Sequence, residues 1–264
     1  MLTILKLGGE LLEDAPALAN AAAAIVRLSS DGPLIVVHGG GRAIDAELRA
    51  RGIEPKFVDG LRVTDRATLD AVVSVLAGRT NTTLIAAIGG AGGRAVGLTG
   101  ADAGIGLSKV AEPLESVSGA AVDLGLVGQP AGTDARLLTE LTSRGYIPVI
   151  ASIGVSAEGE LLNVNADTLA AHLATIAGAE RLIVAGATAG VLDTDGNTIP
   201  ALGRAEIVAM TTSGAAHSGM VAKLAACRRA LDGGVREIAI VNGRNAANFA
   251  AAPGTRVMRE LATR

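Results

Sequence analysis

Short apolar segments rich in β-branched residues alternate along the chain with alanine-rich segments of helical length. Strands that are joined through helices pair in parallel, and helices then cover both faces of the sheet. The expected strands are LTILKL, PLIVVH, AVGL, IPVIA, RLIVA and EIAIV, and the expected helices are Ala15–Leu28, Ala43–Arg51, Arg66–Ala77, Asp134–Ser143, Asn165–Ala177 and Ser218–Leu231. This alternation predicts an α/β fold with a mainly parallel sheet between helices.

Two regions interrupt the alternation of strands and helices. Ile105–Val127 contains short strand-like pieces around glycine and proline, and Val155–Leu162 contains a glycine turn. Both are typical of β-hairpins, which we expect to lie over an edge of the sheet. Because no distinct linker divides the chain, we expect one continuous fold with an N-terminal lobe at 1–150 and a C-terminal lobe at 151–264.

The composition excludes several classes of protein. Of the 264 residues, 49% are hydrophobic but only 1% are aromatic, so the core must be built from alanine, valine, leucine and isoleucine. A net charge of −3 argues against nucleic acid or an anionic membrane as the main partner. Cys227 is the single cysteine, which excludes an internal disulfide, and its helical surroundings indicate a packing residue. No signal peptide or long uninterrupted apolar run is present, so we expect a soluble, cytoplasmic protein.

Two glycine turns follow expected strands. Lys6 lies inside the first apolar strand, which ends at Gly8 and Gly9, and a buried lysine is costly unless an anion meets it. The second turn, HGGG, ends at Gly41 and leads into a helix, where free backbone N–H groups favour anions. Neither turn matches a Walker loop or a dinucleotide fingerprint, and HGGG alone is also consistent with an ordinary tight turn. Together they predict a phosphate site at the carboxyl edge of the sheet.

Further polar residues follow in GLRVTD. Thr64 or Asp65 can cap the helix that begins near Arg66. Arg62 lies just before this cap, where a guanidinium could clamp a substrate carboxylate through two parallel hydrogen bonds. An exposed surface arginine is the alternative interpretation of Arg62.

The stretch LLNVNADT and the later GMVAKL supply the remaining candidates. Asn163, Asn165 and Asp167 alternate, so an extended chain would point all three in one direction. Asn165 or Asp167 could instead cap the following helix, whereas Asp167 could also hold two lysine ammonium groups in place. Lys223 lies about one turn into a helix and can lean back toward its N-terminus, although a surface lysine is the alternative.

Taken in order and spacing, these stretches resemble the amino acid kinase family. The matching pieces are KLGG, VVHGGG, FVDGLRVTD, AVGLTGAD, GYIPVIASIG, EGELLNVNAD, GVLD, GMVAKL and VNGR. The resemblance covers nearly the whole chain. It implies a three-layer αβα sandwich with an open, mainly parallel sheet, in which the N-terminal lobe binds an acyl amino acid and supports dimerisation. The C-terminal lobe would bind ATP, with Mg²⁺ carried mainly by the nucleotide.

The resemblance further implies phosphoryl transfer from ATP to the side-chain carboxylate of N-acetyl-L-glutamate, a step of arginine biosynthesis. Lys6 and Lys223 would approach the transferring group from opposite lobes, and Asp167 would organise both. The resemblance implies that the phosphoryl oxygens contact Gly8, Gly9 and Gly41. The substrate would contact Gly40, Gly41, Arg62 and Asn163. The nucleotide would contact Gly186, Ala187, Gly190, Gly219 and Met220. No protein metal ligand is expected.

One segment departs from the family pattern. After the strand RLIVA the family usually reads Thr-Asp-Val or Ser-Asp-Val, whereas this chain has Gly186 and Ala187 at the positions of the hydroxyl and the carboxylate. That segment borders the nucleotide in the family, so the departure bears on ATP binding and activity. Thr188 and Asp193 are the candidates to compensate for the missing groups.

Three alternatives remain open at this point. A related kinase could act on N-succinylglutamate or on carrier-linked aminoadipate, although the carrier-linked enzymes resemble SRYTD where this chain has GLRVTD. A non-catalytic regulatory protein could retain the fold.

Arginine-inhibited members of the family carry an additional N-terminal helix, and this chain begins at its first strand, so we expect an arginine-insensitive homodimer.

Overall fold

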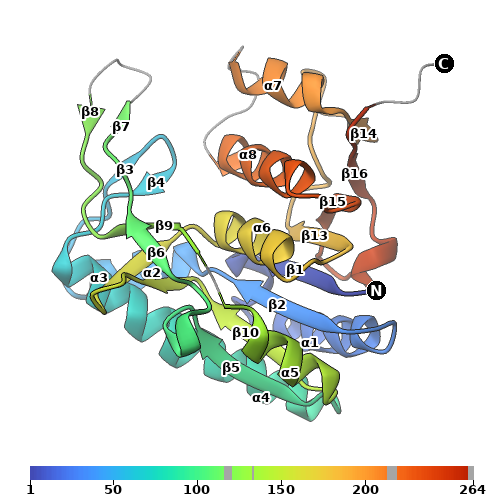
Figure 1. Cartoon of the computed structure of the whole chain (residues 1–264), viewed down its shortest axis with the longest axis horizontal. Helices are drawn as coiled ribbons and strands as arrows, with labels where there is room; N and C mark the ends of the chain where they lie inside the picture. Colours follow the sequence, from blue (N-terminus) through green and yellow to red (C-terminus); the bar gives the residue numbers. More distant parts are fainter. Residues whose placement is uncertain (116–120, 133, 213–218, 261–264) are drawn as a thin grey trace.

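An eight-stranded sheet forms the centre of the protein in a computed structural model, which describes residues 1–115, 121–132, 134–212 and 219–260 (Figure 1). Its strand order is β14-β16-β15-β13-β1-β2-β10-β5, and every neighbouring pair is parallel except β15 with β16. The strands are β1 (Thr3–Leu7), β2 (Leu34–His38), β5 (Ala95–Thr99), β10 (Ile147–Ala151), β13 (Arg181–Gly186), β14 (Ala201–Leu202), β15 (Glu237–Asn242) and β16 (Gly254–Val257). The predicted α/β fold is confirmed, and β14 and β16 extend the sheet beyond the six expected strands.

Helices cover both faces of this sheet. One layer contains α1 and α4, which pack against each other and against strands, while α5, α6 and α8 form the opposite layer, with α7 packed on α8 (Figure 1). The helices are α1 (Ala15–Ser29), α2 (Gly41–Ala50), α3 (Arg66–Val73), α4 (Asn81–Gly90), α5 (Arg136–Ser143), α6 (Ala166–Ile176), α7 (Arg204–Thr212) and α8 (Gly219–Asp232), with short turns η1 (Gly9–Leu11), η3 (Asp102–Gly104) and η4 (Phe249–Ala251). Ser218, the expected first residue of the last long helix, lies outside the described residues.

The alternation of side chains along β1 divides the core into two halves. Ile4 belongs to the cluster beneath α6 and α8, whereas Leu5 and Leu7 belong to the cluster beneath α1 and α4. Because successive side chains of a strand point to opposite faces, Lys6 shares the face of Ile4 and is directed toward α6. The strand therefore carries its single charge toward the layer that contains Asp167.

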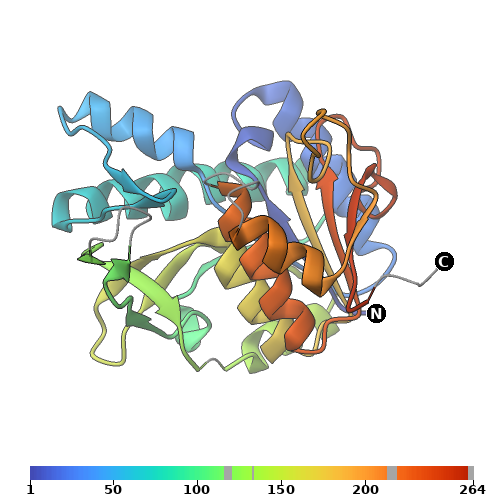
Figure 2. The same cartoon turned by 90° about the horizontal axis from the view of Figure 1, so that it is seen from above.

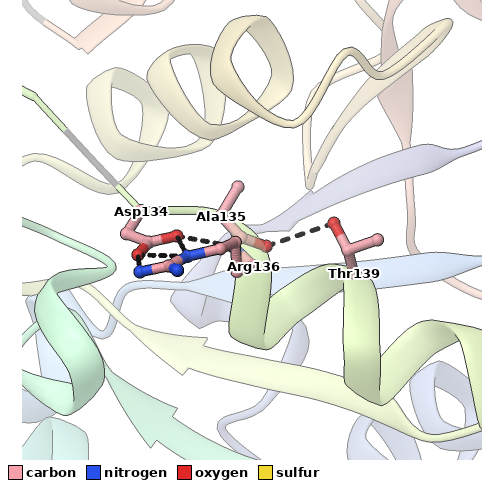
Figure 3. A network of polar contacts seen from close by, with 4 residues as sticks. All are labelled: Asp134, Ala135, Arg136 and Thr139. Atoms are coloured by element: carbon pink, nitrogen blue, oxygen red, sulfur yellow. Dashed lines mark hydrogen bonds and ion pairs between the residues drawn. The ribbon is translucent and has the colours of Figure 1, made fainter.

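Helix α5 begins two residues later than the sequence predicted. The carboxylate of Asp134 accepts the backbone amide of Arg136 at 2.9 Å and its Nε at 2.7 Å, and the Thr139 hydroxyl donates to the carbonyl of Ala135 (Figure 3). A side-chain oxygen that accepts an otherwise unpaired amide is typical of a helix start. Asp134 therefore precedes the helix and stabilises its first turn.

The two expected hairpin regions contribute to a separate four-stranded sheet of order β11-β12-β9-β6. Its strands are β6 (Ser108–Val110), β9 (Val127–Pro130), β11 (Ile153–Val155) and β12 (Leu161–Val164), and β11 and β12 form the predicted antiparallel hairpin. Two small antiparallel pairs, β3 (Phe57–Val58) with β4 (Leu61–Arg62) and β7 (Leu114–Glu115) with β8 (Ala121–Val122), lie beside it. Seen from above, the green strands lie apart from the orange and red C-terminal elements (Figure 2). The two regions therefore form strands of a separate sheet, and their position over an edge of the main sheet stays a prediction.

A continuous helical stretch runs from Arg66 to Gly90, well beyond the predicted end at Ala77. A π-helical segment, η2 (Ser74–Thr80), joins α3 to α4, so Gly78 and the following threonines do not end the helix. With 25 residues and a mean hydropathy of 1.4, the stretch is long and apolar enough to cross a membrane, a property that core helices of soluble proteins share. Here α4 packs against α1, β5 and β10 and belongs to a helical layer of the fold.

Candidate active site

The predicted phosphoryl- and substrate-binding residues, together with Lys6 and Asp167, line a cavity of about 260 Å³ at the carboxyl edge of the central strands. Ligands of open α/β sheets bind at this edge, where neighbouring strands lead away in opposite directions. The cavity is lined by both glycine turns and by residues from β4, β12 and α6, among them Lys6, Gly8, Gly9, Gly40, Gly41, Arg62, Asn163 and Asp167. A larger cavity of about 740 Å³, between β9 and α8, has only Asn165 of the candidate residues in its lining among the described residues.

Two lysines from distant parts of the chain flank one buried carboxylate. The Nζ of Lys6 lies 3.0 Å from Oδ1 of Asp167, and the Nζ of Lys223 lies 4.0 Å from the same oxygen. The three side chains are between 9% and 13% exposed, so water screens their charges poorly. Oδ1 of Asp167 makes no aligned hydrogen bond, so the cluster is held mainly by the attraction between charges.

Asp167 reaches this position from a helix and not from an extended chain. The side chain of Asn165 accepts the amide of Thr168 at 3.0 Å and thereby caps α6, which places Asp167 in the first helical turn. The prediction that an extended stretch points Asn163, Asn165 and Asp167 in one direction is therefore wrong for Asp167. All three nevertheless line the same cavity, because the helix begins directly after β12.

The charges of this cluster shift one another's proton affinity. Burial raises the pKa of Asp167, but attraction to Lys6 and then to Lys223 outweighs this effect, and the pKa lies below its ordinary value. Burial and the positive charge of Lys6 lower the pKa of Lys223, although Asp167 and Glu10 oppose the change. Removal of either carboxylate would therefore make Lys223 easier to deprotonate.

The two glycine turns approach each other closely. A β-carbon on Gly9 would stand 2.8 Å from Cα of Gly40, so a larger residue at Gly9 would separate the turns. Gly41 is the first residue of α2, where the backbone N–H has no intrahelical acceptor. The amide of Gly8, in contrast, donates to the carbonyl of Ala185 at 2.8 Å. The predicted phosphoryl contact through the Gly8 amide is therefore wrong for this arrangement, because that N–H already pairs β1 with β13.

A buried histidine supports the second turn, and sequence reasoning missed it. The ring of His38, which is fully buried, lies 3.0 Å from Nδ2 of Asn81, and Asn81 also donates to the carbonyl of Val149. Burial lowers the pKa of His38 to about 4, so the ring is neutral at physiological pH. The histidine that precedes the glycines in HGGG was the available sequence signal.

Arg62 is buried at the substrate side of the cavity. Its Nη2 donates to Asp45 at 2.6 Å and to the carbonyl of Gly41 at 3.2 Å, and its guanidinium lies over the ring of Phe57. Its Nη1 is buried with no partner. A buried guanidinium nitrogen without an acceptor is costly, so this geometry favours a ligand oxygen at Nη1 and argues against an exposed surface arginine.

Asn163 occupies the neighbouring wall. Its Nδ2 donates to the hydroxyl of Thr64 at 3.0 Å, and that hydroxyl donates to the carbonyl of Arg62. Asp65, and not Thr64, caps α3 by accepting the amide of Thr68. The structure thus decides between the two predicted caps and assigns Thr64 to the support of Asn163 and Arg62.

The predicted nucleotide-side residues occupy two segments. Gly186 ends β13 and Ala187 follows it, while Gly219 and Met220 begin the described part of α8, one turn before Lys223. Gly190 has a φ of +102°, and a β-carbon there would stand 2.6 Å from the hydroxyl of Thr255. Packing against β16 therefore explains this glycine, and its predicted nucleotide contact stays untested.

Cys227 lies on α8 with no exposed surface. Burial, reinforced by the charge of Asp167, raises the pKa of the thiol to about 12, so the thiolate does not form at neutral pH. The predicted packing role is confirmed.

Among residues 1–115, 121–132, 134–212 and 219–260, no group of three or more histidine, cysteine, aspartate or glutamate side chains is arranged to hold a metal ion. Mg²⁺ that is bound mainly by the phosphate oxygens of a nucleotide needs few protein ligands, so these residues are compatible with it.

Glycine turns, paired ammonium groups and an unpartnered guanidinium at one sheet edge define an anion-binding site on an αβα sandwich. The chain belongs to the amino acid kinase family, whose model matches residues 1–242. It is 40% identical to the acetylglutamate kinase of Sphingopyxis alaskensis over 91% of this chain and 82% of the relative. It is 43% identical to the acetylglutamate kinase of Acidiphilium cryptum over 80% of this chain and 72% of the relative.

A solved structure shares the whole fold. The N-acetylglutamate synthase of Neisseria gonorrhoeae, complexed with coenzyme A and N-acetylglutamate, superposes with a TM-score of 0.83 and 26% sequence identity. The alignment covers 98% of this chain and 60% of the synthase. The likeness therefore concerns one part of a longer protein.

Proposed function

We propose that this protein is an acetylglutamate kinase, a transferase that phosphorylates the side-chain carboxylate of N-acetyl-L-glutamate with ATP in arginine biosynthesis. The observation that carries the proposal is the pair Lys6 and Lys223, whose ammonium groups flank Asp167 at the edge of a cavity that also contains the unpartnered Nη1 of Arg62. The similarity to acetylglutamate kinases over most of the chain supports the same substrate.

The chemistry needs positioning and charge stabilisation more than a base. A carboxylate oxygen of the substrate attacks the γ-phosphorus of ATP, a new P–O bond forms, and the bond to the departing ADP oxygen breaks. Lys6 and Lys223 stabilise the negative charge on the transferring group, while Asp167 holds both ammonium groups in place. Mg²⁺ bound to the nucleotide would supply further charge neutralisation.

The substrate contacts follow from the groups on the cavity wall. Arg62 binds the α-carboxylate through Nη1, because Nη2 is already engaged by Asp45. Asn163 binds the acetylamino end, and Gly40 and Gly41 line the same pocket. The free amide of Gly41 and the turn at Gly9 receive the phosphoryl oxygens.

The organisation of the protein is part of the proposal. Residues 1–150 form the lobe for N-acetyl-L-glutamate and for dimerisation, and residues 151–264 form the lobe for ATP, with Gly186, Ala187, Gly190, Gly219 and Met220 beside the nucleotide. We propose a cytoplasmic homodimer. Sedimentation of the purified protein tests the dimer.

An ADP-release assay with purified protein distinguishes the candidate functions. N-acetyl-L-glutamate, N-succinyl-L-glutamate, a carrier-linked aminoadipate and no acceptor are compared at saturating ATP and Mg²⁺. We expect ADP release to depend on N-acetyl-L-glutamate and to fall by about 100- to 10,000-fold in Lys223→Ala. Preference for another acceptor would favour a related kinase, whereas ATP binding without acceptor-dependent ADP release would favour a regulatory protein. A fully active Lys223→Ala protein would contradict the assigned chemistry.

A further inference from the structure

Glu10 places a carboxylate beside the segment where this chain departs from its family. Its Oε1 accepts the backbone amide of Ala187 at 3.0 Å, across 177 positions of sequence. Glu10 belongs to the turn η1, directly after the first glycine turn, and lines the same cavity as Lys6 and Asp167.

Two glycines make room for this carboxylate. A β-carbon on Gly8 would stand 2.4 Å from Oε1 and 2.5 Å from Oε2 of Glu10, so any side chain at Gly8 would displace the carboxylate. A β-carbon on Gly186 would stand 3.0 Å from Oε1 of Glu10 and 3.9 Å from Nζ of Lys223. A side chain at 186 would therefore lie beside both the Glu10 carboxylate and the Lys223 ammonium.

The two candidates named from the sequence do not take this place. Asp193 accepts the amides of Asp195 and Asn197 and closes an exposed turn, and Thr188 is exposed. The carboxylate that reaches the backbone at Ala187 belongs to Glu10, near the N-terminus of the chain.

We propose that Glu10 is a positioning residue of this active site, which supplies the acidic group that Gly186 and Ala187 lack and holds the Lys223 ammonium and the 186–187 backbone in place. The inference rests on the proposed kinase function for its catalytic consequence. The charged groups around Lys223 are Lys6 of β1, Asp167 of α6 and Glu10 of η1, and the neutral Cys227 thiol lies on the same helix as Lys223.

The removal of this carboxylate has a defined electrostatic consequence. Glu10 raises the pKa of Lys223 against the effects of burial and Lys6, so its neutralisation makes Lys223 lose its proton at lower pH. A displaced ammonium lowers the rate of the chemical step. The Glu10→Gln substitution should therefore reduce kcat.

The experiment compares full-length wild type with Glu10→Gln and with the control Glu13→Gln, an acid three residues away that pairs with Arg42. Each protein is labelled with ¹³C at the lysine ε-carbon, which gives few signals because the chain has four lysines. They are Lys6, Lys56, Lys109 and Lys223, of which Lys56 and Lys109 are exposed. The Lys223 signal is assigned by its loss in Lys223→Arg.

We expect Glu10→Gln to lower kcat by about 10- to 100-fold and to move the Lys223 titration to lower pH, with Lys56 unmoved and Glu13→Gln like wild type. The double variant Glu10→Ala, Gly186→Asp, which returns a carboxylate beside Lys223, should recover both readouts in part. An unchanged or increased kcat, or a kcat loss with an unmoved Lys223 titration, would overturn the role of Glu10. A wild-type protein without N-acetyl-L-glutamate-dependent turnover would instead refute the proposed function, while the titration would still test the electrostatic effect of Glu10 on Lys223.

Discussion

Replacement of Asp167 by asparagine removes the single negative charge that lies between two buried ammonium groups. At the observed separations of 3.0 Å and 4.0 Å and an effective dielectric constant of about 20, the two attractions amount to about 5.5 and about 4 kcal/mol. The desolvation of the charges offsets much of this gross energy, so the net effect on stability is smaller. We expect Asp167→Asn to lower the free energy of unfolding by about 3 kcal/mol, because Lys223 can still turn toward water.

The substitution should also impair catalysis. Without the carboxylate, Lys6 and Lys223 repel each other and lose their common anchor, so the transferring phosphoryl group meets displaced charges. We expect kcat to fall by about 100- to 1,000-fold in a coupled ADP-release assay at saturating substrates. Urea unfolding at the same pH measures the change in stability. The matched control is Glu160→Gln, which breaks an exposed ion pair with Arg66 and should cost less than about 1 kcal/mol with unchanged kcat.

The dependence on pH provides an independent check. The folded-state pKa of Asp167 lies below its ordinary value of 3.8, so the folded protein binds this proton less readily than the unfolded chain. Its stabilising contribution is complete above that ordinary pKa and is lost as the pH falls through the folded-state pKa. The difference in stability between wild type and Asp167→Asn should therefore be largest near neutral pH and should shrink in strong acid. Equal kcat within about threefold, together with equal stability at neutral pH, would refute the reasoning.

Three further predictions concern single side chains. Because burial and Lys6 lower the pKa of Lys223, kcat should decline with rising pH through a pKa below the ordinary lysine value of 10.5. Lys223→Arg should remove that decline, and an identical pH profile in this variant would assign the decline to another group. Arg62→Lys should raise the KM for N-acetyl-L-glutamate by about 10- to 100-fold with a smaller change in kcat, because lysine lacks the planar fork that engages Asp45 through Nη2 and leaves Nη1 for the ligand; an unchanged KM would remove Arg62 from the substrate site. Cys227, with a pKa of about 12, should resist iodoacetamide at pH 8 until the protein is unfolded, and rapid alkylation of the native protein would contradict its burial.

Local patterns in the sequence were sufficient to predict much of the scaffold. The β-branched runs became central strands because their alternating faces must be buried on both sides, and Lys6 could be placed on a strand end for the same reason. The sequence narrowed each of two helix caps to a pair of residues, since capping depends on residues three positions apart, and the structure selected Asp65 and Asn165. The end of the helix at Ala77 was predicted wrongly, because the packing of α4 on α1 stabilises a helix across Gly78 that propensity alone would end.

The candidate site likewise has features that the sequence determined and features that only the tertiary structure decided. The sequence by itself determined which residues carry charge and where glycine turns follow strands, since both depend on neighbours in the chain. The tertiary structure decided that Lys6 and Lys223 share one oxygen of Asp167, that the Gly8 amide is already paired, and that Glu10 reaches Ala187. These contacts depend on how β1, β13, α6 and α8 pack, because residues far apart in sequence meet where packed elements bring their backbones together.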